Sequence, residues 1–361
     1  MIIYLDKTIF EHAESLNFSE EEYLLFSDLA IAHQRGRCFL CGDLSCLEWF
    51  ADNLTGLHSS IYKRISHKQA ETKAIINIVE SILVLSYSTT PLLPSFLDNK
   101  ARVLSIQNAI DYRLSSECTL IGENLNDCCF YKLIAERYIH SKNIRGVQLS
   151  FHEELGGGDT MNTVFKKCVT VDKTLALCLV DCDIKYGKTK TYPANPARGN
   201  TVNKLTTTYK ELQAKINPST YELYCLPIHE VENLIPTSVL DSVATSSVPE
   251  ISAGVTYLHT LFGANLIDAI LCYDFKYGDA KLKDPPAIQY WSEIKETTSV
   301  TVLPRLSAKV LEPAIAVLQG NTHDTENTIT VVPLDSYLVP FWNTIGQKVF
   351  SWGCANLPIR A

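Results

Sequence analysis

One segment, from Thr174 to Val180, constrains the fold more than any other part of the sequence. It is an almost unbroken apolar run, and it ends directly at Asp181. Strands of this kind are buried on both faces, which is typical of a parallel sheet covered by helices on both sides. The segment therefore predicts an α/β protein rather than an all-helical or all-β one.

Other short apolar segments alternate with helical patterns along the chain of 361 residues, a length that favours more than one domain. We expect strands at 2–5, 38–41, 118–121, 147–151, 174–180 and 221–226, and helices at 20–33, 44–53, 68–87, 127–140 and from about 159 to 168. The Pro-containing stretch 89–95 breaks the pattern and is a candidate linker. These patterns predict a smaller N-terminal α/β domain over 1–112, a catalytic domain over 113–300 and a C-terminal extension over 301–361 packed on it.

Composition narrows the protein class. The chain has 32 Lys and Arg against 40 Asp and Glu, a formal charge of −8. Any binding of nucleic acid must therefore use a local basic patch or be supplied by a partner. The 12 cysteines sit mostly in apolar runs, and the first residues predict a strand rather than a secretion signal. We expect a reduced cytoplasmic protein without a membrane span, since the most apolar helical pattern, near 75–85, is too short.

Acidic residues collect where the expected strands end. Glu123 and Asp127 follow the strand at 118–121, Asp181 and Asp183 follow the next, and Glu230 and Glu232 follow the strand at 221–226. Parallel strands present their carboxyl ends at one edge of a sheet, where ligands bind. Carboxylates gathered there repel one another unless a cation neutralises them, and oxygen ligands select Mg²⁺ or Mn²⁺. The pattern favours phosphoryl transfer or phosphodiester hydrolysis at a two-metal site.

Each feature alone also has a structural explanation. An Asp-x-Asp after a strand is often a turn or a helix cap, and Asp127 is placed to cap the helix that follows it. The functional interpretation rests on three such features occurring at successive strand ends.

These residues together resemble a known domain. The segments Leu120–Asp127, Gly156–Gly158, Val180–Asp183 and His229–Ile235 are similar in order and spacing to the motifs of the TOPRIM domain, over about residues 117–300. The closest resemblance is to the OLD-family nucleases and related TOPRIM effectors of bacterial anti-phage systems. The resemblance implies a Rossmann-like parallel sheet with helical additions and a metal-dependent nuclease activity.

The resemblance also implies roles for single residues. Glu123 corresponds to the general acid/base and metal-site glutamate, although Gly122 precedes it here where the family has a glycine after it. Four further residues correspond to the metal-binding acids: Asp127, Asp181, Asp183 and Glu232. Gly156–Gly158 corresponds to the glycine-rich loop beside the site. Lys276 corresponds to a late lysine that stabilises transition-state charge, with an ordinary surface lysine as the alternative.

A basic stretch follows the Asp-x-Asp motif. Its candidate nucleic-acid-binding residues are Lys185, Lys188, Lys190 and Arg198. Cations beside a carboxylate cluster are suited to hold a phosphate backbone near bound metals. The alternative is a solvated loop.

Three further patterns leave alternatives open. Cys38 and Cys41 form a Cys-x-x-Cys that could bind zinc, but a structural zinc site needs more ligands, and their place on an expected strand favours core thiols. Asp6 and Asp43 each follow a strand and could form a second acidic site. Cys128 and Cys129, early in a helix, could be thiols of low pKa or part of the core.

The expected function is a Mg²⁺- or Mn²⁺-dependent endonuclease that cleaves DNA or tRNA as the effector of a bacterial anti-phage system. The resemblance implies an ATPase partner. The chain has no P-loop motif of its own, so any ATP dependence would have to come from another chain. A homodimer is also compatible with the sequence. The main alternative is a catalytically silent TOPRIM-fold scaffold or regulatory subunit that binds the partner ATPase. A TOPRIM primase or topoisomerase-like activity is a further alternative, for which the chain lacks the expected accessory domains.

Overall fold

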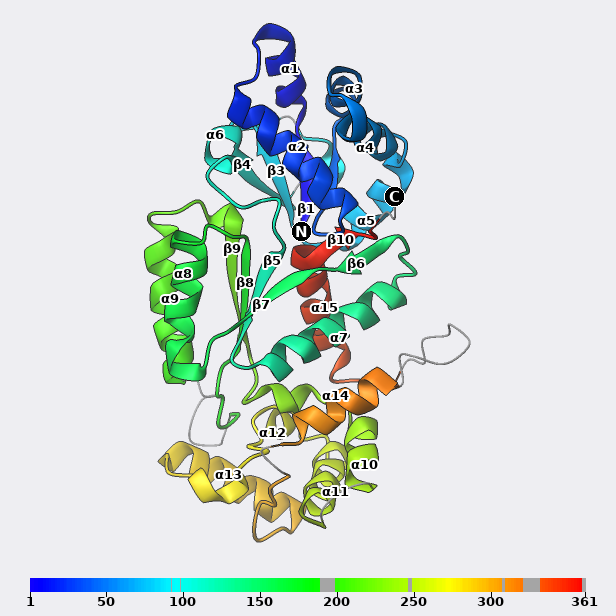
Figure 1. Cartoon of the computed structure of the whole chain (residues 1–361). Coiled ribbons are helices and arrows are strands. Elements are labelled where there is room, and N and C mark those ends of the chain that lie inside the picture. Colours follow the sequence, from blue (N-terminus) through cyan, green and yellow to red (C-terminus); the bar gives the residue numbers. More distant parts are fainter. Residues whose placement is uncertain are drawn as a thin grey trace. The chain divides into compact units, whose positions relative to one another are not determined.

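The computed structural model is an α/β protein with parallel sheets (Figure 1). It describes residues 1–91, 93–97, 99–188, 199–245, 249–306, 309–320 and 332–358. Contacts divide the chain into two compact units, each assembled from separate segments. Unit 1 comprises Met1–Cys178, Leu205–Leu223 and Thr344–Ala361, and unit 2 comprises Leu179–Lys204 and Tyr224–Asn343.

The first sheet has the strand order β2-β1-β3-β4, with all its neighbouring strands parallel. The strands are β1 (Ile2–Leu5), β2 (Phe39–Gly42), β3 (Ile82–Ser86) and β4 (Ala101–Ser105). Its helices are α1 (Lys7–Ser15), α2 (Glu20–Gln34), α3 (Leu44–Asn53), α4 (Gly56–Ser66), α5 (Gln69–Ile78) and α6 (Ile106–Ala109), with the 3₁₀ turn η1 (Ser95–Leu97). β1, β2 and β3 are buried along their whole length, as expected for strands covered on both faces.

The prediction of a helix over 68–87 is wrong for the second half of that range. α5 ends at Ile78, and residues Ile82–Ser86 form β3, between β1 and β4. Pairing with two neighbouring strands outweighs the local helical pattern of this short apolar run. Residues 89–95 consequently connect β3 to β4 within one sheet and do not link two domains.

The second sheet has the order β7-β5-β8-β9, and β5 is parallel to both β7 and β8. Its strands are β5 (Cys118–Gly122), β7 (Phe151–Leu155), β8 (Ala176–Asp181) and β9 (Tyr221–Leu226). Its helices are α7 (Leu125–Ser141), α8 (Met161–Thr170) and α9 (Asn200–Gln213), with 3₁₀ turns η2 (Gly158–Thr160) and η3 (Pro218–Thr220). Every residue of β8 before Asp181 is buried, which confirms the expected strand.

The C-terminal residues complete unit 1. β6 (Val147–Leu149) pairs antiparallel with β10 (Cys354–Asn356), which follows α15 (Val339–Gly353). Phe350 and Cys354 belong to the same hydrophobic cluster as Ile2 and Tyr4 of the first strand. The segment expected to extend the middle domain thus contributes its last part, from residue 344, to the unit that contains the N-terminus.

Unit 2 is mainly helical after β9. Its elements are η4 (Val231–Leu234), α10 (Thr237–Thr245), α11 (Pro249–Gly263), α12 (Ile267–Leu271), η5 (Gly278–Lys281), α13 (Pro285–Thr298) and α14 (Leu311–Gly320). Tyr273 and Trp291 are large fully buried side chains of its core, and their rings lie 5.8 Å apart. Among the helices that the structure describes, none has the length and apolar character needed to cross a membrane.

Candidate functional site

The Asp-x-Asp segment of unit 2 is fixed to the loop that follows β9. Backbone N–H groups of Cys182 and Ile184 both donate to the carbonyl oxygen of Ile228, at 3.2 and 3.4 Å. These two bonds lie on either side of Asp183 and place it beside the chain that continues into His229. Asp183 has a φ of 50°, a left-handed conformation that short polar side chains tolerate better than most. The backbone therefore aims this carboxylate in a defined direction.

Gly199 lies against that carboxylate. A Cβ atom at this position would overlap the Oδ2 atom of Asp183, so only glycine allows the chain to pass so closely. The backbone N–H of Gly199 also donates to the carbonyl oxygen of Cys182, at 3.3 Å. The chain on both sides of Asp183 is thus held in place within unit 2.

Two buried glutamates and one lysine form the centre of the site. Glu230 and Glu232 are 5% and 3% exposed. The Nζ atom of Lys276 lies 2.9 Å from Oε2 of Glu230 and 3.5 Å from Oε1 of Glu232. Oε2 of Glu232 has no hydrogen-bond partner among the residues that the structure describes. Leaving a buried carboxylate oxygen unpaired is costly, so this atom calls for a hydrogen-bond donor or a cation.

The chain that carries Lys276 is anchored by Asn233 and Glu230. The side-chain Nδ2 of Asn233 donates to the carbonyl oxygens of Ile270 and Tyr273, at 2.8 and 2.9 Å. Oε1 of Glu230 accepts the backbone N–H of Phe275 at 2.6 Å. The amide of Asn233 therefore holds the end of α12 and the following loop against η4, and this positions Lys276 over the glutamates.

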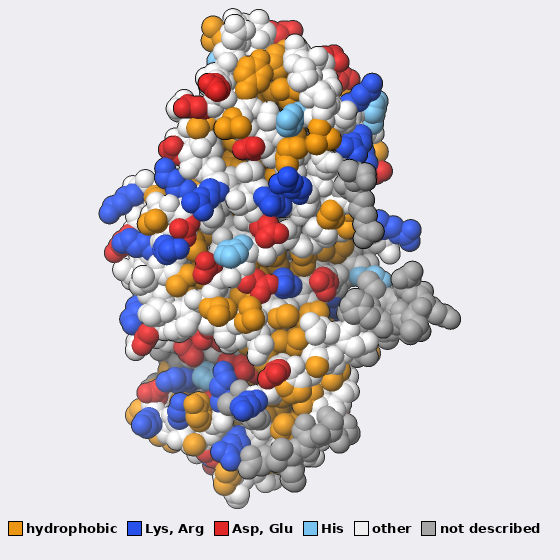
Figure 2. Space-filling view, in the orientation of Figure 1, with side chains coloured by type: hydrophobic (Ala, Val, Ile, Leu, Met, Phe, Trp, Pro, Cys, Tyr) orange, Lys and Arg blue, Asp and Glu red, His pale blue; other side chains and the backbone are white. Residues whose placement is uncertain are grey.

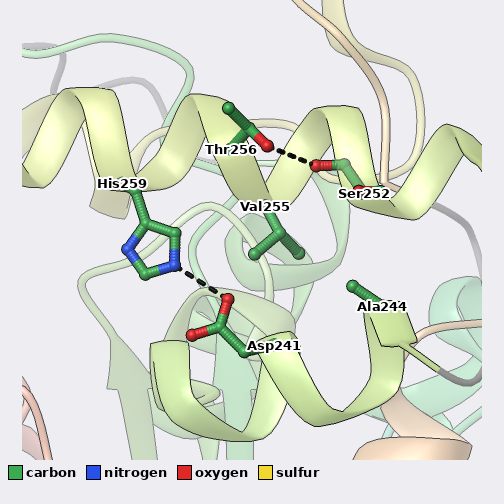
Figure 3. A pocket seen from close by; sticks show the side chains of 6 residues that line it. All are labelled: Asp241, Ala244, Ser252, Val255, Thr256 and His259. Carbon is green, nitrogen blue, oxygen red and sulfur yellow. Dashed lines mark hydrogen bonds and ion pairs between the residues drawn. The ribbon is translucent and has the colours of Figure 1, made fainter.

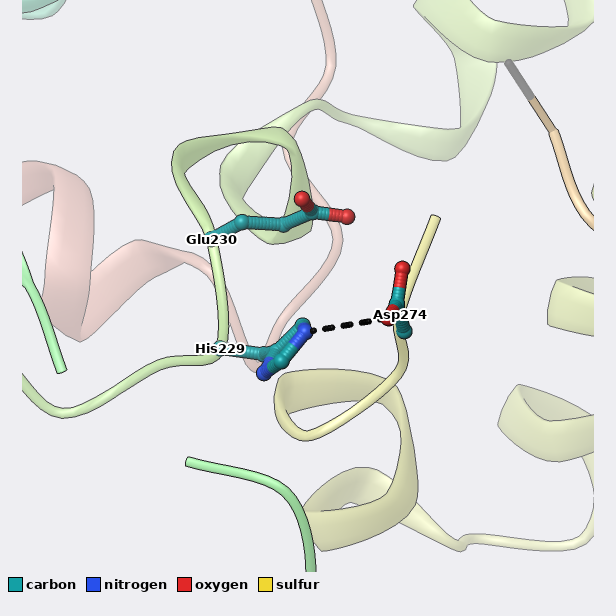
Figure 4. A group of neighbouring side chains, drawn as sticks. All are labelled: His229, Glu230 and Asp274. Carbon is teal, nitrogen blue, oxygen red and sulfur yellow. Dashed lines mark ion pairs between the residues drawn. The ribbon is translucent and has the colours of Figure 1, made fainter. Parts of the chain in front are cut away.

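A histidine and an aspartate lie beside the same glutamate. Figure 4 shows His229 and Glu230 on one loop and Asp274 on another, with Nε2 of His229 3.6 Å from Oδ2 of Asp274. One ligand atom from each of the three residues lies within 4.8 Å of the others, a spacing that could hold a metal ion. Asp274 is itself fixed by backbone N–H groups of Lys276 and Tyr277, at 3.0 and 2.7 Å.

The electrostatics of this group are strongly perturbed. Burial, and then the nearby charge of Glu232, raise the pKa of Glu230 to about 7, against the opposing effects of Lys276 and His229. For Lys276, burial opposes the charged form, but Glu230, Glu232 and Asp181 together raise its pKa well above the ordinary value. Burial likewise opposes the charged form of His229, but Asp274, Glu230 and Asp183 raise its pKa overall. Asp181 and Asp183 therefore belong to the same electrostatic cluster.

We call this set the carboxylate cluster: Asp181, Asp183, His229, Glu230, Glu232, Asp274 and Lys276. It contains four of the residues expected from the sequence, namely Asp181, Asp183, Glu232 and Lys276. Sequence reasoning noted Glu230 only as an acidic residue at a strand end, and it missed His229 and Asp274. His229 had a local signal, since it lies three residues before Glu232 of the Glu-Asn pair, whereas Asp274 is brought to the site only by the tertiary fold.

Glu123 and Asp127 lie in unit 1, at the end of β5. The carbonyl oxygen of Glu123 accepts the N–H of Gly157, and that of Gly122 accepts the N–H of Gly156, at 3.0 and 2.8 Å. The glycine loop thus passes directly beside the strand end. Asp127 caps α7, since its Oδ2 accepts the N–H of Asn124 at 3.1 Å. This is the structural role weighed for Asp127, and its role as a metal ligand stays a prediction.

The basic stretch is only partly within the described residues. Lys185 and Lys188 are exposed, and Lys185 lies 3.4 Å from Asp284. Lys190 and Arg198 fall outside the described residues. On the face of the molecule shown in Figure 2, acidic and basic side chains are interspersed. Nucleic-acid binding by the basic stretch stays a prediction.

The cysteine motifs are part of the core. Cys38 and Cys41 are buried, and their thiols approach the carbonyl oxygens of Leu29 and Ile3, at 3.9 and 3.6 Å. Burial raises the pKa of Cys38 to about 12, so it stays a neutral thiol. Cys128 is also buried, and its pKa rises to about 12 for the same reason, so the alternative of a thiol with low pKa is wrong.

The two N-terminal aspartates have structural roles. Asp6 accepts the N–H of Thr8 at 3.4 Å and caps α1, while Asp43 accepts the N–H of Ser45 at 3.1 Å and caps α3. Hydroxyl groups of Thr8 and Ser86 also donate to Asp6, at 2.8 and 2.9 Å. These bonds account for both carboxylates as helix caps.

A pocket of about 250 Å³ lies between α10 and α11 (Figure 3). Nε2 of His259 lies 2.8 Å from Oδ1 of Asp241 across it, and both side chains are about half exposed. Such an exposed pair contributes little beyond holding two helices together. The buried, perturbed groups are instead concentrated in the carboxylate cluster.

No known protein family matches this chain, and neither a curated protein nor a solved structure does. The functional argument therefore rests on the chain's own residues.

Proposed function

We propose that the protein is a metal-dependent phosphodiesterase acting on nucleic acid, and that the carboxylate cluster holds its divalent cations. The observation that carries the proposal is Oε2 of Glu232, a carboxylate oxygen on a side chain only 4% exposed, with no hydrogen-bond partner among the described residues. Buried carboxylates are normally paired or coordinate a metal. Lys276 forms ion pairs with both Glu230 and Glu232, so its single positive charge is shared between two carboxylates. A bound divalent cation would balance the remaining negative charge of the cluster.

The donor atoms fit Mg²⁺ or Mn²⁺. Asp181, Asp183, Glu230 and Glu232 supply hard oxygen ligands, and His229 with Asp274 adds an imidazole that Mn²⁺ accepts more readily than Mg²⁺. When bound, such a cation would polarise the scissile phosphate and lower the pKa of an attacking water. The raised pKa of Glu230 means that below about pH 7 a proton competes for this carboxylate.

The protein groups have separate tasks in this proposal. Asp181, Asp183 and Glu232 hold the cation. Gly199 has no side chain, and this leaves room for the carboxylate of Asp183. Asn233 fixes the loop whose Lys276 faces the negative charge that develops on the phosphate, where a preorganised cation is most effective. Glu123, at the end of β5, is proposed by its resemblance to the TOPRIM glutamate to act as the general acid/base.

The resemblance to TOPRIM and OLD-family motifs supports a nucleic-acid substrate, DNA or tRNA, and an ATPase partner in an anti-phage system. The competing proposal is a TOPRIM-fold scaffold or regulatory subunit without catalysis. A scaffold has no need of buried like charges that share one lysine, because such groups reduce stability unless they serve a ligand.

The test is a cleavage assay on purified protein with plasmid, single-stranded DNA and total tRNA, each with Mg²⁺, Mn²⁺ or EDTA. We compare the wild type with Glu232→Gln, and with Glu296→Gln as a matched change on an exposed face of α13. The proposal predicts cleavage that requires metal, survives in Glu296→Gln and falls by at least about 100-fold in Glu232→Gln. Equal cleavage by both variants, or cleavage in EDTA, would contradict it.

A further inference from the structure

We infer that Lys276 is an internal counter-cation that occupies part of the metal position in the metal-free protein and is displaced when a divalent cation binds. The inference rests on the proposed function and adds a regulatory property to the same site. The lysine and the metal compete for the same carboxylate oxygens. The lysine therefore raises the metal concentration at which the site fills.

The geometry places Lys276 where a cation belongs. Its Nζ atom lies 2.9 Å from Glu230 and 3.5 Å from Glu232, and it is close enough to Asp181 for that charge to affect it. No other lysine or arginine among the described residues pairs with either glutamate. The one ammonium group therefore makes the ion pairs that a bound cation would make in its place.

The lysine covers the cluster incompletely. It bridges Oε2 of Glu230 and Oε1 of Glu232, and it leaves Oε2 of Glu232 without a partner among the described residues. A divalent cation brings twice the charge and several coordination positions, so it can satisfy oxygens that a single ammonium group cannot reach. Metal binding therefore replaces the two ion pairs of Lys276 with contacts that also reach the unpaired oxygen of Glu232.

The side chain of Lys276 has room to move away from the glutamates toward solvent. Its side chain is 34% exposed, whereas those of the two glutamates are 7% and 4% exposed, so Lys276 is the most solvent-accessible of the three residues. A flexible four-carbon stem allows the ammonium group to move outward without moving the loop that Asn233 holds. Once displaced, the same group is free to meet a substrate phosphate.

Competition of this kind has a thermodynamic signature. Because pairing and metal binding exclude each other, the apparent metal affinity of the wild type is lowered by the fraction of protein in which Lys276 leaves the carboxylates free, and removal of the lysine should restore the intrinsic affinity. Removal of a lysine that only supports the fold would lower stability without changing metal affinity. The two roles therefore give different results in one experiment.

The experiment compares Lys276→Met with Lys295→Met as a matched control. Lys295 pairs with Asp279 in the same unit at 2.7 Å, and its side chain is similarly half-buried at 23% exposure. Mn²⁺ is titrated into each metal-free protein by calorimetry, and the thermal midpoint is recorded with EDTA and with saturating Mn²⁺. No nucleic acid and no catalytic turnover are involved.

We expect Lys276→Met to bind Mn²⁺ at least about tenfold more tightly than the wild type, and to gain more thermal stability from it. Lys295→Met should bind Mn²⁺ as the wild type does, and Lys276→Arg should restore the weaker binding. Equal or weaker Mn²⁺ binding by Lys276→Met would overturn the inference while leaving the metal site intact. If no variant and no wild-type protein binds Mn²⁺, the proposed function itself fails, and the inference fails with it.

Discussion

Replacement of Glu230 by Gln is expected to make the metal-free protein more stable and to abolish the proposed metal-dependent cleavage. Glu230 is 5% exposed, and it faces Glu232 from the same turn, His229 beside it and Lys276 from the loop after α12. These surroundings raise its pKa from the ordinary 4.5 to about 7. At pH 8 the folded chain must still ionise this buried group.

The magnitude follows from the difference between the folded and unfolded states. A shift of about 2.5 pKa units corresponds to about 3 kcal/mol of stability lost once Glu230 is ionised. Glutamine removes that cost and keeps an oxygen to accept the N–H of Phe275, although the bond loses its charge and about 1 kcal/mol. Glu230→Gln should therefore raise the free energy of unfolding at pH 8 by about 2 kcal/mol.

The sign of the pH dependence is part of the prediction. Glu230 is protonated in both states below pH 4.5, so wild type and variant differ least there. As the pH rises from about 4.5 to about 7, the wild type loses stability that Glu230→Gln keeps, and the difference levels off above that range. The advantage of the variant should thus grow from below about 1 kcal/mol at pH 5 to its full size at pH 8.

Urea unfolding in EDTA at pH 5 and pH 8, followed by circular dichroism, measures both quantities. Glu296→Gln, on an exposed helix face, should stay within about 0.5 kcal/mol of the wild type at both pH values. A Glu230→Gln protein that is less stable than the wild type at pH 8 would refute the reasoning, because it would mark Glu230 as a structural ion-pair partner.

Three further predictions concern other parts of the chain. Burial lowers the pKa of His33 to about 3, so the neutral folded form loses stability as pH falls below 6.5, by about 2 kcal/mol at pH 5; His33→Asn should flatten this acid dependence in urea unfolding, and an unchanged slope would contradict it. Lys348 is 7% exposed and pairs with Glu80 and Glu222, so Lys348→Met should cost about 2 kcal/mol in thermal unfolding by removing the cation that both partly buried carboxylates share, although Glu222 keeps its ion pair with Arg102, and a loss below about 0.5 kcal/mol would contradict this. Glu123→Gln should reduce metal-dependent cleavage by about 100-fold or more if it is the general acid/base, whereas activity within fivefold of the wild type would exclude it.

Three strands of the second sheet, β5, β8 and β9, were predicted because they carry a strong local signal, whereas β7 lies largely beyond the strand expected at 147–151. β8 is a continuous apolar run, and β9 was placed at residues 221–226 without error. The first sheet was harder, since Ile82–Ser86 is too short to distinguish a strand from a helical turn by periodicity. Its identity as β3 depends on pairing with β1 and β4, and that pairing is made by residues distant in the sequence.

Part of the candidate site was predictable because its acidic residues lie at a strand end. Asp181 is the last residue of β8 and Asp183 lies two residues beyond it, so together with the acids at two other strand ends they suggested a ligand site. Asp274 lies in a loop after α12, more than 40 residues beyond His229, and only the tertiary fold brings the two side chains to 3.6 Å. No local pattern signals a contact of that kind.

The central claim is that a divalent cation binds at the unpartnered oxygen of Glu232. The most direct measurement is a crystal of the protein soaked in Mn²⁺, with the ion located by its anomalous scattering. The account predicts a peak in contact with Oε2 of Glu232 and a carboxylate of the Asp181–Asp183 segment, with Lys276 moved away from Glu230. A structure at saturating Mn²⁺ with no peak there, and with Lys276 still between the two glutamates, would contradict it.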